Sequence, residues 1–110
     1  MPDTLLPDNP LQFIRACVRA KKIFWTYHVN MRLKERMINR DMVLQSIEFY
    51  EIIESYPDDR YLPSYLVRTR TSSTVLHILF AVDINNDNVR VITAYFPDPD
   101  QWDKTMKRRL

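Results

Sequence analysis

Apolar residues recur at intervals of three and four in the first half of the chain, which predicts helices there. The first helix begins after the N-cap residue Asn9 and is predicted over residues 10–22. Thr26 caps a second helix over residues 27–37, and Asn39 caps a third that begins near residue 40. Between the first two helices, the β-rich run IFWTY predicts a short extended piece.

Four β-rich runs follow in the second half of the chain: EIIESY, SYLVRTRT, TVLHILFAVD and NVRVITAYF. Short turns join the last three runs, which predicts an antiparallel meander, and the proline-bounded loop PDDRYLP precedes them. Asp98, Pro99 and Gln101 form a helix-start signal and predict a short C-terminal helix.

These elements predict a single α+β domain over residues 1–110, with residues 1–9 as a flexible N-terminal tail. We expect two or three N-terminal helices packed on an antiparallel sheet of about four strands, followed by the short C-terminal helix. No apolar run approaches the roughly 20 residues that cross a bilayer, and the N-terminus has no secretion signal. We therefore expect a cytoplasmic protein that does not associate with membranes.

The turns of the predicted meander set the strand register. A turn at residues 72–73 places Arg68 opposite His77, and a symmetric turn at residues 86–87 places Asp83 opposite Arg90 as an ion pair. Both pairings follow from the short length of the connecting turns.

The same register sorts candidate functional residues between the two faces of the predicted sheet. His77, Arg68 and Arg70 gather on one face, with His77 opposite Phe96. Tyr95 falls on the other, apolar face, which the helices cover, so it is predicted to be a core residue unless a bulge intervenes. His77 is therefore expected to point toward a more polar surface, although a half-buried histidine with one backbone partner is an equal alternative.

The predicted second helix carries a stripe of His28, Arg32 and Arg36, which spans about 80° around the helix. Such arginines suit phosphate binding because their stems pack while the planar guanidinium presents several donors. The alternative is a solvated helix face whose arginines pair with acidic residues of the same chain.

Composition narrows the classes of function. The chain contains no glycine, which excludes the phosphate-binding loop, the dinucleotide fingerprint and the calcium loop. One cysteine and two histidines are too few for a zinc site of their own. Residues 11–40 hold eight Lys or Arg residues and one acidic residue, although the net charge is only +2. This basic segment is expected either to bind along a polyanion or to lie against acidic strands of the same molecule.

Two histidines, several arginines and no metal-ligand cluster suit the cleavage of RNA. RNA carries its own nucleophile, the 2′-hydroxyl, so the protein needs only a base, an acid and cations at the phosphate. We expect the imidazoles of His28 and His77 to converge with the arginines in one anion-binding hollow.

Several segments occur in the order and spacing of a known family: WTYHVNMRLKERMINRDMVLQSI, EIIESYPDD, LPSYLV, LHILFAVD and VRVITAYFPDPDQW. On these segments the chain resembles the bacterial domain of unknown function numbered forty-two fifty-eight, across nearly its whole length. Such domains look like distant relatives of the small ribonuclease toxins of the RelE, BrnT and MqsR type. The residues that match the family pattern are His28, Arg32, Arg36, His77, Tyr95, Asp98 and Trp102.

The residues and the resemblance together lead us to expect a toxin-like, metal-independent endoribonuclease of a toxin-antitoxin module, without a cofactor. The resemblance also implies a cognate antitoxin of the zinc-finger or helix-turn-helix type as a partner. Two alternatives remain: a non-catalytic protein-binding domain, and an RNA-binding domain without catalysis. The candidate catalytic residues are His28, His77, Arg32, Arg36 and Tyr95, and the candidate phosphate-binding residues are Arg68, Arg70 and Lys34.

Overall fold

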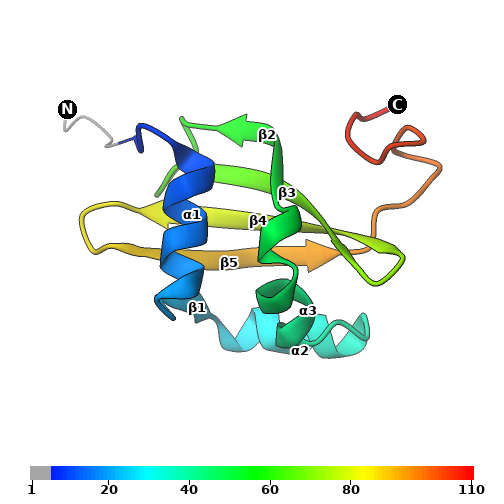
Figure 1. Cartoon of the computed structure of the whole chain (residues 1–110), viewed down its shortest axis with the longest axis horizontal. Helices are drawn as coiled ribbons and strands as arrows, with labels where there is room; N and C mark the ends of the chain where they lie inside the picture. Colours follow the sequence, from blue (N-terminus) through cyan, green and yellow to red (C-terminus); the bar gives the residue numbers. More distant parts are fainter. Residues whose placement is uncertain (1–5) are drawn as a thin grey trace.

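The computed structural model describes residues 6–110, so the expected N-terminal tail falls partly on residues 1–5, outside the described part. The helices, the single 3-10 turn η1 and the strands are α1 (Pro10–Arg19), β1 (Ile23–Trp25), α2 (Tyr27–Glu35), α3 (Arg40–Gln45), η1 (Ile47–Phe49), β2 (Glu51–Tyr56), β3 (Ser64–Thr71), β4 (Thr74–Asp83) and β5 (Asn88–Tyr95). Helices α1 and α3 lie on one face of the sheet, and α2 runs along its β1 edge (Figure 1). None of the helices in residues 6–110 is long and apolar enough to cross a membrane.

The sheet differs from the prediction in both strand number and pairing. It has five strands in the order β1-β5-β4-β3-β2, and β1 pairs in parallel with β5. The antiparallel four-stranded sheet that the sequence suggested is therefore wrong, although the α+β class holds. The fifth strand is β1, which lies in the run predicted as a short extended piece, but the sequence shows neither its partner nor its direction.

The helix starts follow the predicted caps, and the helix ends explain how a chain without glycine turns. The side chains of Asn9, Thr26 and Asn39 each accept a hydrogen bond from a backbone N–H in the first turn of their helix. Helix α2 ends in a Schellman motif, in which Met37 has a φ of 60° and the N–H of Ile38 donates to the carbonyl of Leu33. The turn buries Leu33 and Ile38 together and leads to α3, which lies on the same face of the sheet as α1.

The turn at residues 72–73 places Arg68 opposite His77, as predicted. In the next hairpin the prediction was wrong, because Asp83 pairs with Asn88 and His77 pairs with Tyr95. The turn spans residues 84–87, which places Asn88 opposite Asp83. A bulge in β5 then leaves Ile92 without a partner between Val91 and Thr93 and brings Tyr95 opposite His77.

The bulge changes which residues of β5 face the helices. Val91 and Ala94 are buried in the core, and Thr93 and Tyr95 point to the opposite face, beside Leu79 and His77 of β4. Tyr95 is therefore not a core residue, and it lies beside His77.

The predicted C-terminal helix is also wrong. Residues 97–110 form turns and one isolated bridge between Trp102 and Arg109. This C-terminal segment folds back over the sheet face that carries His77 and Arg68, opposite the face covered by α1 and α3. Trp102 is only 2% exposed, so the segment buries an aromatic side chain that a short exposed helix would leave in water.

Candidate functional site

A hollow of about 740 Å³ lies between α2, the loop of residues 57–63 and the strands β4 and β5. His28, Arg32 and Arg36 of α2 all line it, so the stripe predicted from helical periodicity forms one wall. Its volume falls within the roughly 300–1,000 Å³ typical of small-molecule sites. Among the described residues, this hollow collects the largest share of the predicted functional side chains.

Helix α2 presents this stripe because its neighbouring side chains are anchored in the core. Val29 and Leu33 are 8% and 3% exposed and pack in the hydrophobic core, which fixes the rotation of the helix. His28 and Arg32, one position before each of them, consequently stand at the edge of the buried face. The sequence folds this way because the Thr26 cap and the turn at Met37 set both ends of the helix.

Arg36, at the C-terminal end of the stripe, is hydrogen-bonded to β5. Its guanidinium donates to the hydroxyl of Thr93 at 3.1 Å and to the carbonyl of Ala94 at 2.8 Å. Thr93 faces the hollow only because the bulge at Ile92 turns it there. The same nitrogen makes both bonds, so the remaining donors of the guanidinium fork are left for a ligand.

His28 and Arg32 are exposed, and within residues 6–110 neither side chain forms a hydrogen bond or an ion pair. The solvated-face alternative required these cations to be paired with acidic residues of the chain, and Arg32 has no such pair in the described part. An unpaired guanidinium beside an imidazole can accept a phosphate without first breaking an internal ion pair.

The opposite wall comes from residues that the sequence analysis did not assign to a site. Asp59 and Tyr61 of the loop line the hollow, together with Arg90 of β5. Arg90 donates to Asp83 at 3.1 Å, so the predicted ion pair forms although the two residues are not directly opposite. The signal for Tyr61 was its place between Pro57 and Pro63, which marks an ordered loop but not its position in space.

Asp59 is the only acidic residue that lines the hollow among the described residues, and both its oxygens are occupied. It accepts from the hydroxyl of Ser64 at 2.6 Å and from the backbone N–H of Arg60 at 2.9 Å. These hydrogen bonds, the one from Ser64 first, lower the pKa of its carboxyl group. The carboxylate therefore acts mainly to hold the loop.

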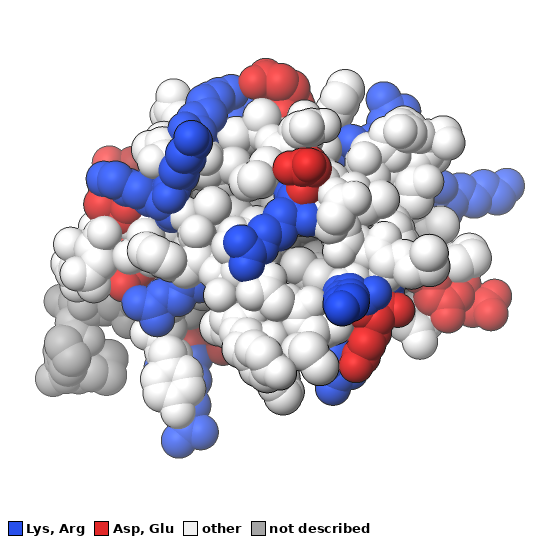
Figure 2. Space-filling model, turned by 90° about the horizontal axis from the view of Figure 1, so that it is seen from below, with Lys and Arg blue, Asp and Glu red and all other residues white. Residues whose placement is uncertain are grey.

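The face that carries α2 has a mixed charge. Figure 2 shows Lys and Arg side chains spread over this face, with Asp and Glu side chains near several of them and uncharged surface between. A continuous basic surface, as the charge count of residues 11–40 suggested, is therefore absent from this view. Local attraction of an anion depends on the few cations in the hollow.

His77 lies elsewhere, beneath the C-terminal segment, and does not line the hollow. It is completely buried, with Nε2 at 2.7 Å from the carbonyl of Met106 and Nδ1 at 3.3 Å from the hydroxyl of Tyr95. The ring of Trp102 lies edge-on to the imidazole of His77, with the two ring centroids 4.5 Å apart. Because a carbonyl only accepts, Nε2 carries the hydrogen, and Nδ1 of the neutral ring accepts from Tyr95. Burial is the main cause that lowers the pKa of His77.

The two histidines therefore do not converge in one hollow, contrary to the expectation from the sequence. His77 instead has the role that the half-buried alternative described, with a backbone partner and with Tyr95 and Trp102 around it. Its environment favours the neutral form but leaves no path to solvent within the described residues.

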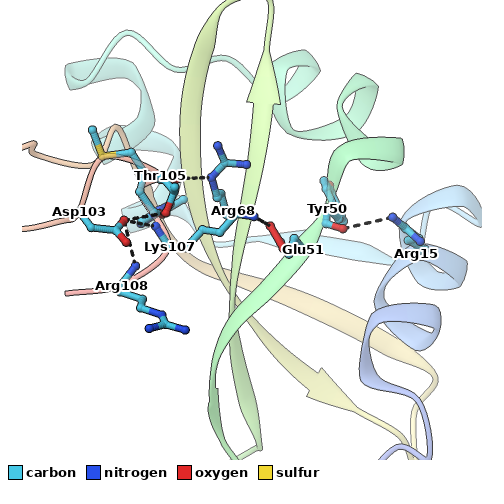
Figure 3. Close-up of polar contacts among 10 residues, drawn as sticks. Arg15, Tyr50, Glu51, Arg68, Asp103, Thr105, Lys107 and Arg108 are labelled. Atoms are coloured by element: carbon cyan, nitrogen blue, oxygen red, sulfur yellow. Dashed lines mark hydrogen bonds and ion pairs between the residues drawn. The ribbon is translucent and has the colours of Figure 1, made fainter.

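The remaining predicted cations hold the fold or lie apart from the hollow. Arg68 donates through Nε to the carbonyl of Thr105 at 2.8 Å, and Lys107 pairs with Glu51 at 3.2 Å, so both attach the C-terminal segment to the sheet (Figure 3). Arg70 lies over the ring of Phe49, with its guanidinium carbon 5.5 Å from the ring centroid. Lys34 is exposed on α2 and does not line the hollow.

Residues 6–110 bring together no three side chains of His, Cys, Asp or Glu that could hold a metal ion. Cys17 is buried, and burial raises the pKa of its thiol. Among the described residues, the ionisable groups that line the hollow are one imidazole, three guanidinium groups, the carboxylate of Asp59 and the phenol of Tyr61.

Comparison with known proteins gives one match. The family described as "Domain of unknown function (DUF4258)" matches residues 25–96, which contain α2, strands β2 to β5 and every residue that lines the hollow. The match leaves out α1 and the C-terminal segment. No curated protein and no solved structure matches the chain. Since the matched region covers well over half of the sequence, the chain belongs to the DUF4258 family of domains of unknown function, as its sequence motifs suggested.

Proposed function

We propose that the protein is a metal-independent endoribonuclease that acts at the hollow beside α2. The observation that carries this proposal is that His28, Arg32 and Arg36 line one hollow, and that among described residues His28 and Arg32 have no internal partner. Guanidinium groups can bind the scissile phosphate and stabilise the charge that develops on it. An exposed imidazole beside the phosphate site can take up or release a proton during the reaction.

The proposed step uses the hydroxyl that RNA itself supplies. Neutral His28 removes the proton of the 2′-hydroxyl, the 2′ oxygen attacks the adjacent phosphorus, and the bond to the 5′ oxygen breaks. The leaving 5′ oxygen takes a proton from water, which gives a 2′,3′-cyclic phosphate and a 5′-hydroxyl end. Arg32 and Arg36 hold the non-bridging phosphate oxygens throughout. His77 takes no part.

The test is incubation of the purified protein with RNA in excess chelator, with the ends of the products identified. His28→Ala is expected to lower the cleavage rate by about 10²- to 10⁴-fold, the usual contribution of general acid–base catalysis. Arg32→Gln is expected to weaken RNA binding. Lys34→Gln is the matched control, because it removes the same charge from the same helix but outside the hollow. Equal rates for His28→Ala and the parent protein would refute the proposal.

RNA binding without cleavage is the second candidate, because only one histidine lines the hollow. It is expected to give salt-dependent RNA binding, weakened by Arg32→Gln, with the RNA intact. If neither binding nor cleavage is detected, the arginines serve another ligand and both candidates fail.

A toxin role would follow if cleavage occurs in cells. The support for it is the family resemblance, and its test is growth arrest on induction that His28→Ala abolishes. Rescue by the product of a neighbouring gene would identify the antitoxin, whereas growth arrest unaffected by His28→Ala would contradict a ribonuclease toxin.

A further inference from the structure

The rim of the hollow carries an aromatic ring that the proposed cleavage step does not use. Tyr61 lines the hollow and is 84% exposed, which is unusual for a large side chain in a loop that is otherwise held in place. Its ring is polarised by the guanidinium of Arg60, whose central carbon lies 5.6 Å from the ring centroid. One face of the ring is thus in contact with a cation, and the opposite face is available to a flat ligand.

The loop that carries Tyr61 is fixed to the sheet at both sides of the tyrosine. Before it, the backbone N–H of Asp59 donates to the carbonyl of Tyr56 at 3.2 Å, and the carboxylate of Asp59 accepts from Ser64. After it, the carbonyl of the buried Pro63 accepts from the backbone N–H of Val82 at 2.9 Å. A ring on a fixed loop loses little conformational freedom when a ligand stacks on it.

We propose that an unpaired RNA base stacks on Tyr61 while the phosphate of a neighbouring nucleotide lies at Arg32 and Arg36. The ligand of the hollow is therefore single-stranded RNA. This inference rests on the proposed function, since it names the form of RNA that the same site takes. Every base has a flat face that can stack on an aromatic ring, and tracks of cations beside such rings are typical of single-strand binding. In a duplex the bases are already stacked and paired, so none is offered to Tyr61.

The charges and the apolar lining of the hollow fit this ligand. Arg32 and Arg36 lie on the α2 wall and Tyr61 on the loop wall, so that a phosphate and a base meet different sides of one space. Between them the floor includes Ala81 and Ile92, and apolar side chains suit the faces of bases better than phosphates. The polar groups are thus at one side and the stacking surface at the other.

The experiment uses a short 2′-O-methyl RNA that carries one 2-aminopurine, because it lacks the nucleophile and cannot be cleaved. Binding is followed by fluorescence anisotropy and stacking by quenching of the 2-aminopurine. The full chain is expected to bind the single strand and quench it, and to bind the same strand annealed to its complement much more weakly. Tyr61→Ala is expected to weaken binding by about 5- to 150-fold and to remove the quenching.

Two controls separate stacking from other effects of the substitution. Tyr61→Phe keeps the ring and is expected to bind and quench like the parent protein. Tyr27→Ala removes a tyrosine that is 78% exposed but does not line the hollow, and it is expected to change neither signal. If Tyr61→Ala binds and quenches like the parent, or duplex binds as tightly as single strand, the inference is overturned while the proposed function stands. If the parent protein binds no RNA, both fail.

Discussion

Replacement of His28 by Phe is expected to abolish cleavage without loss of stability, whereas replacement of His77 by Phe is expected to lower stability without loss of cleavage. His28→Phe changes an exposed side chain without described partners, so the free energy of unfolding should stay within about 0.5 kcal/mol of the parent. His77→Phe keeps an aromatic ring beside Trp102 but removes the donor to the carbonyl of Met106. Cleavage should be lost in the first variant and kept in the second.

The expected loss of stability in His77→Phe follows from its two hydrogen bonds. The bond to Met106 is short, at 2.7 Å, and leaves a part-buried carbonyl without a partner when it is removed, which costs about 1–3 kcal/mol. The contact with Tyr95 is long, at 3.3 Å, and Tyr95 is half-buried, so its hydroxyl can turn toward water and adds little. We expect a net loss of about 2 kcal/mol, or a fall in melting temperature of about 8–16 °C.

The assay is urea unfolding at pH 7.5, paired with RNA cleavage at a temperature at which each variant is fully folded. A His77→Phe variant as stable as the parent would refute the role of the Met106 hydrogen bond. Loss of cleavage in folded His77→Phe together with full cleavage in His28→Phe would reverse the assignment of the active site.

Three further predictions concern stability. Because the folded pKa of His77 is lowered from 6.5, the unfolded chain binds its proton first on acidification. Unfolding free energy should therefore fall as the pH drops through about 6.5, less so in His77→Phe, as urea titrations at several pH values will show. Met37→Gly should raise the free energy of unfolding in urea titrations by about 1 kcal/mol, because Met37 is 84% exposed at a φ of 60°, whereas Met37→Ala should not. Arg109→Ala should lower the free energy of unfolding by about 1 kcal/mol, and with it the thermal midpoint, because it removes the two hydrogen bonds to Glu54 and the cation 4.6 Å from the ring centroid of Trp102. An unchanged thermal midpoint would contradict this.

Local signals in the sequence predicted the parts of the fold that depend on neighbours in the chain. The caps at Asn9, Thr26 and Asn39 marked the helix starts correctly, because a side chain and the N–H groups it caps lie within three residues. The turn at residues 72–73 set the register of β3 and β4 for the same reason. The stripe on α2 followed from helical spacing alone, so half of the candidate site could be predicted.

Contacts between distant segments determined what the sequence could not show. The β5 bulge depends on how the strand fits β4 and α2 together, and it moved Tyr95 beside His77. The cap signal at Asp98 did form a turn, since its carbonyl accepts from the N–H groups of Gln101 and Trp102, but no helix continues. The burial of Trp102 against His77 outweighed it.

The unpaired Ile92 gives β5 one residue more than the stretch of β4 with which it pairs. A substitution at this position changes one side chain that is 43% exposed, at the floor of the hollow. Deletion of Ile92 would restore simple alternation and leave Thr93 beside Arg36 and Tyr95 beside His77, because each residue keeps its present partner on β4. Insertion of a further residue after Ile92 would instead turn Thr93 and Tyr95 to the opposite face. Working variants of this chain should therefore tolerate the loss of Ile92 better than such an insertion.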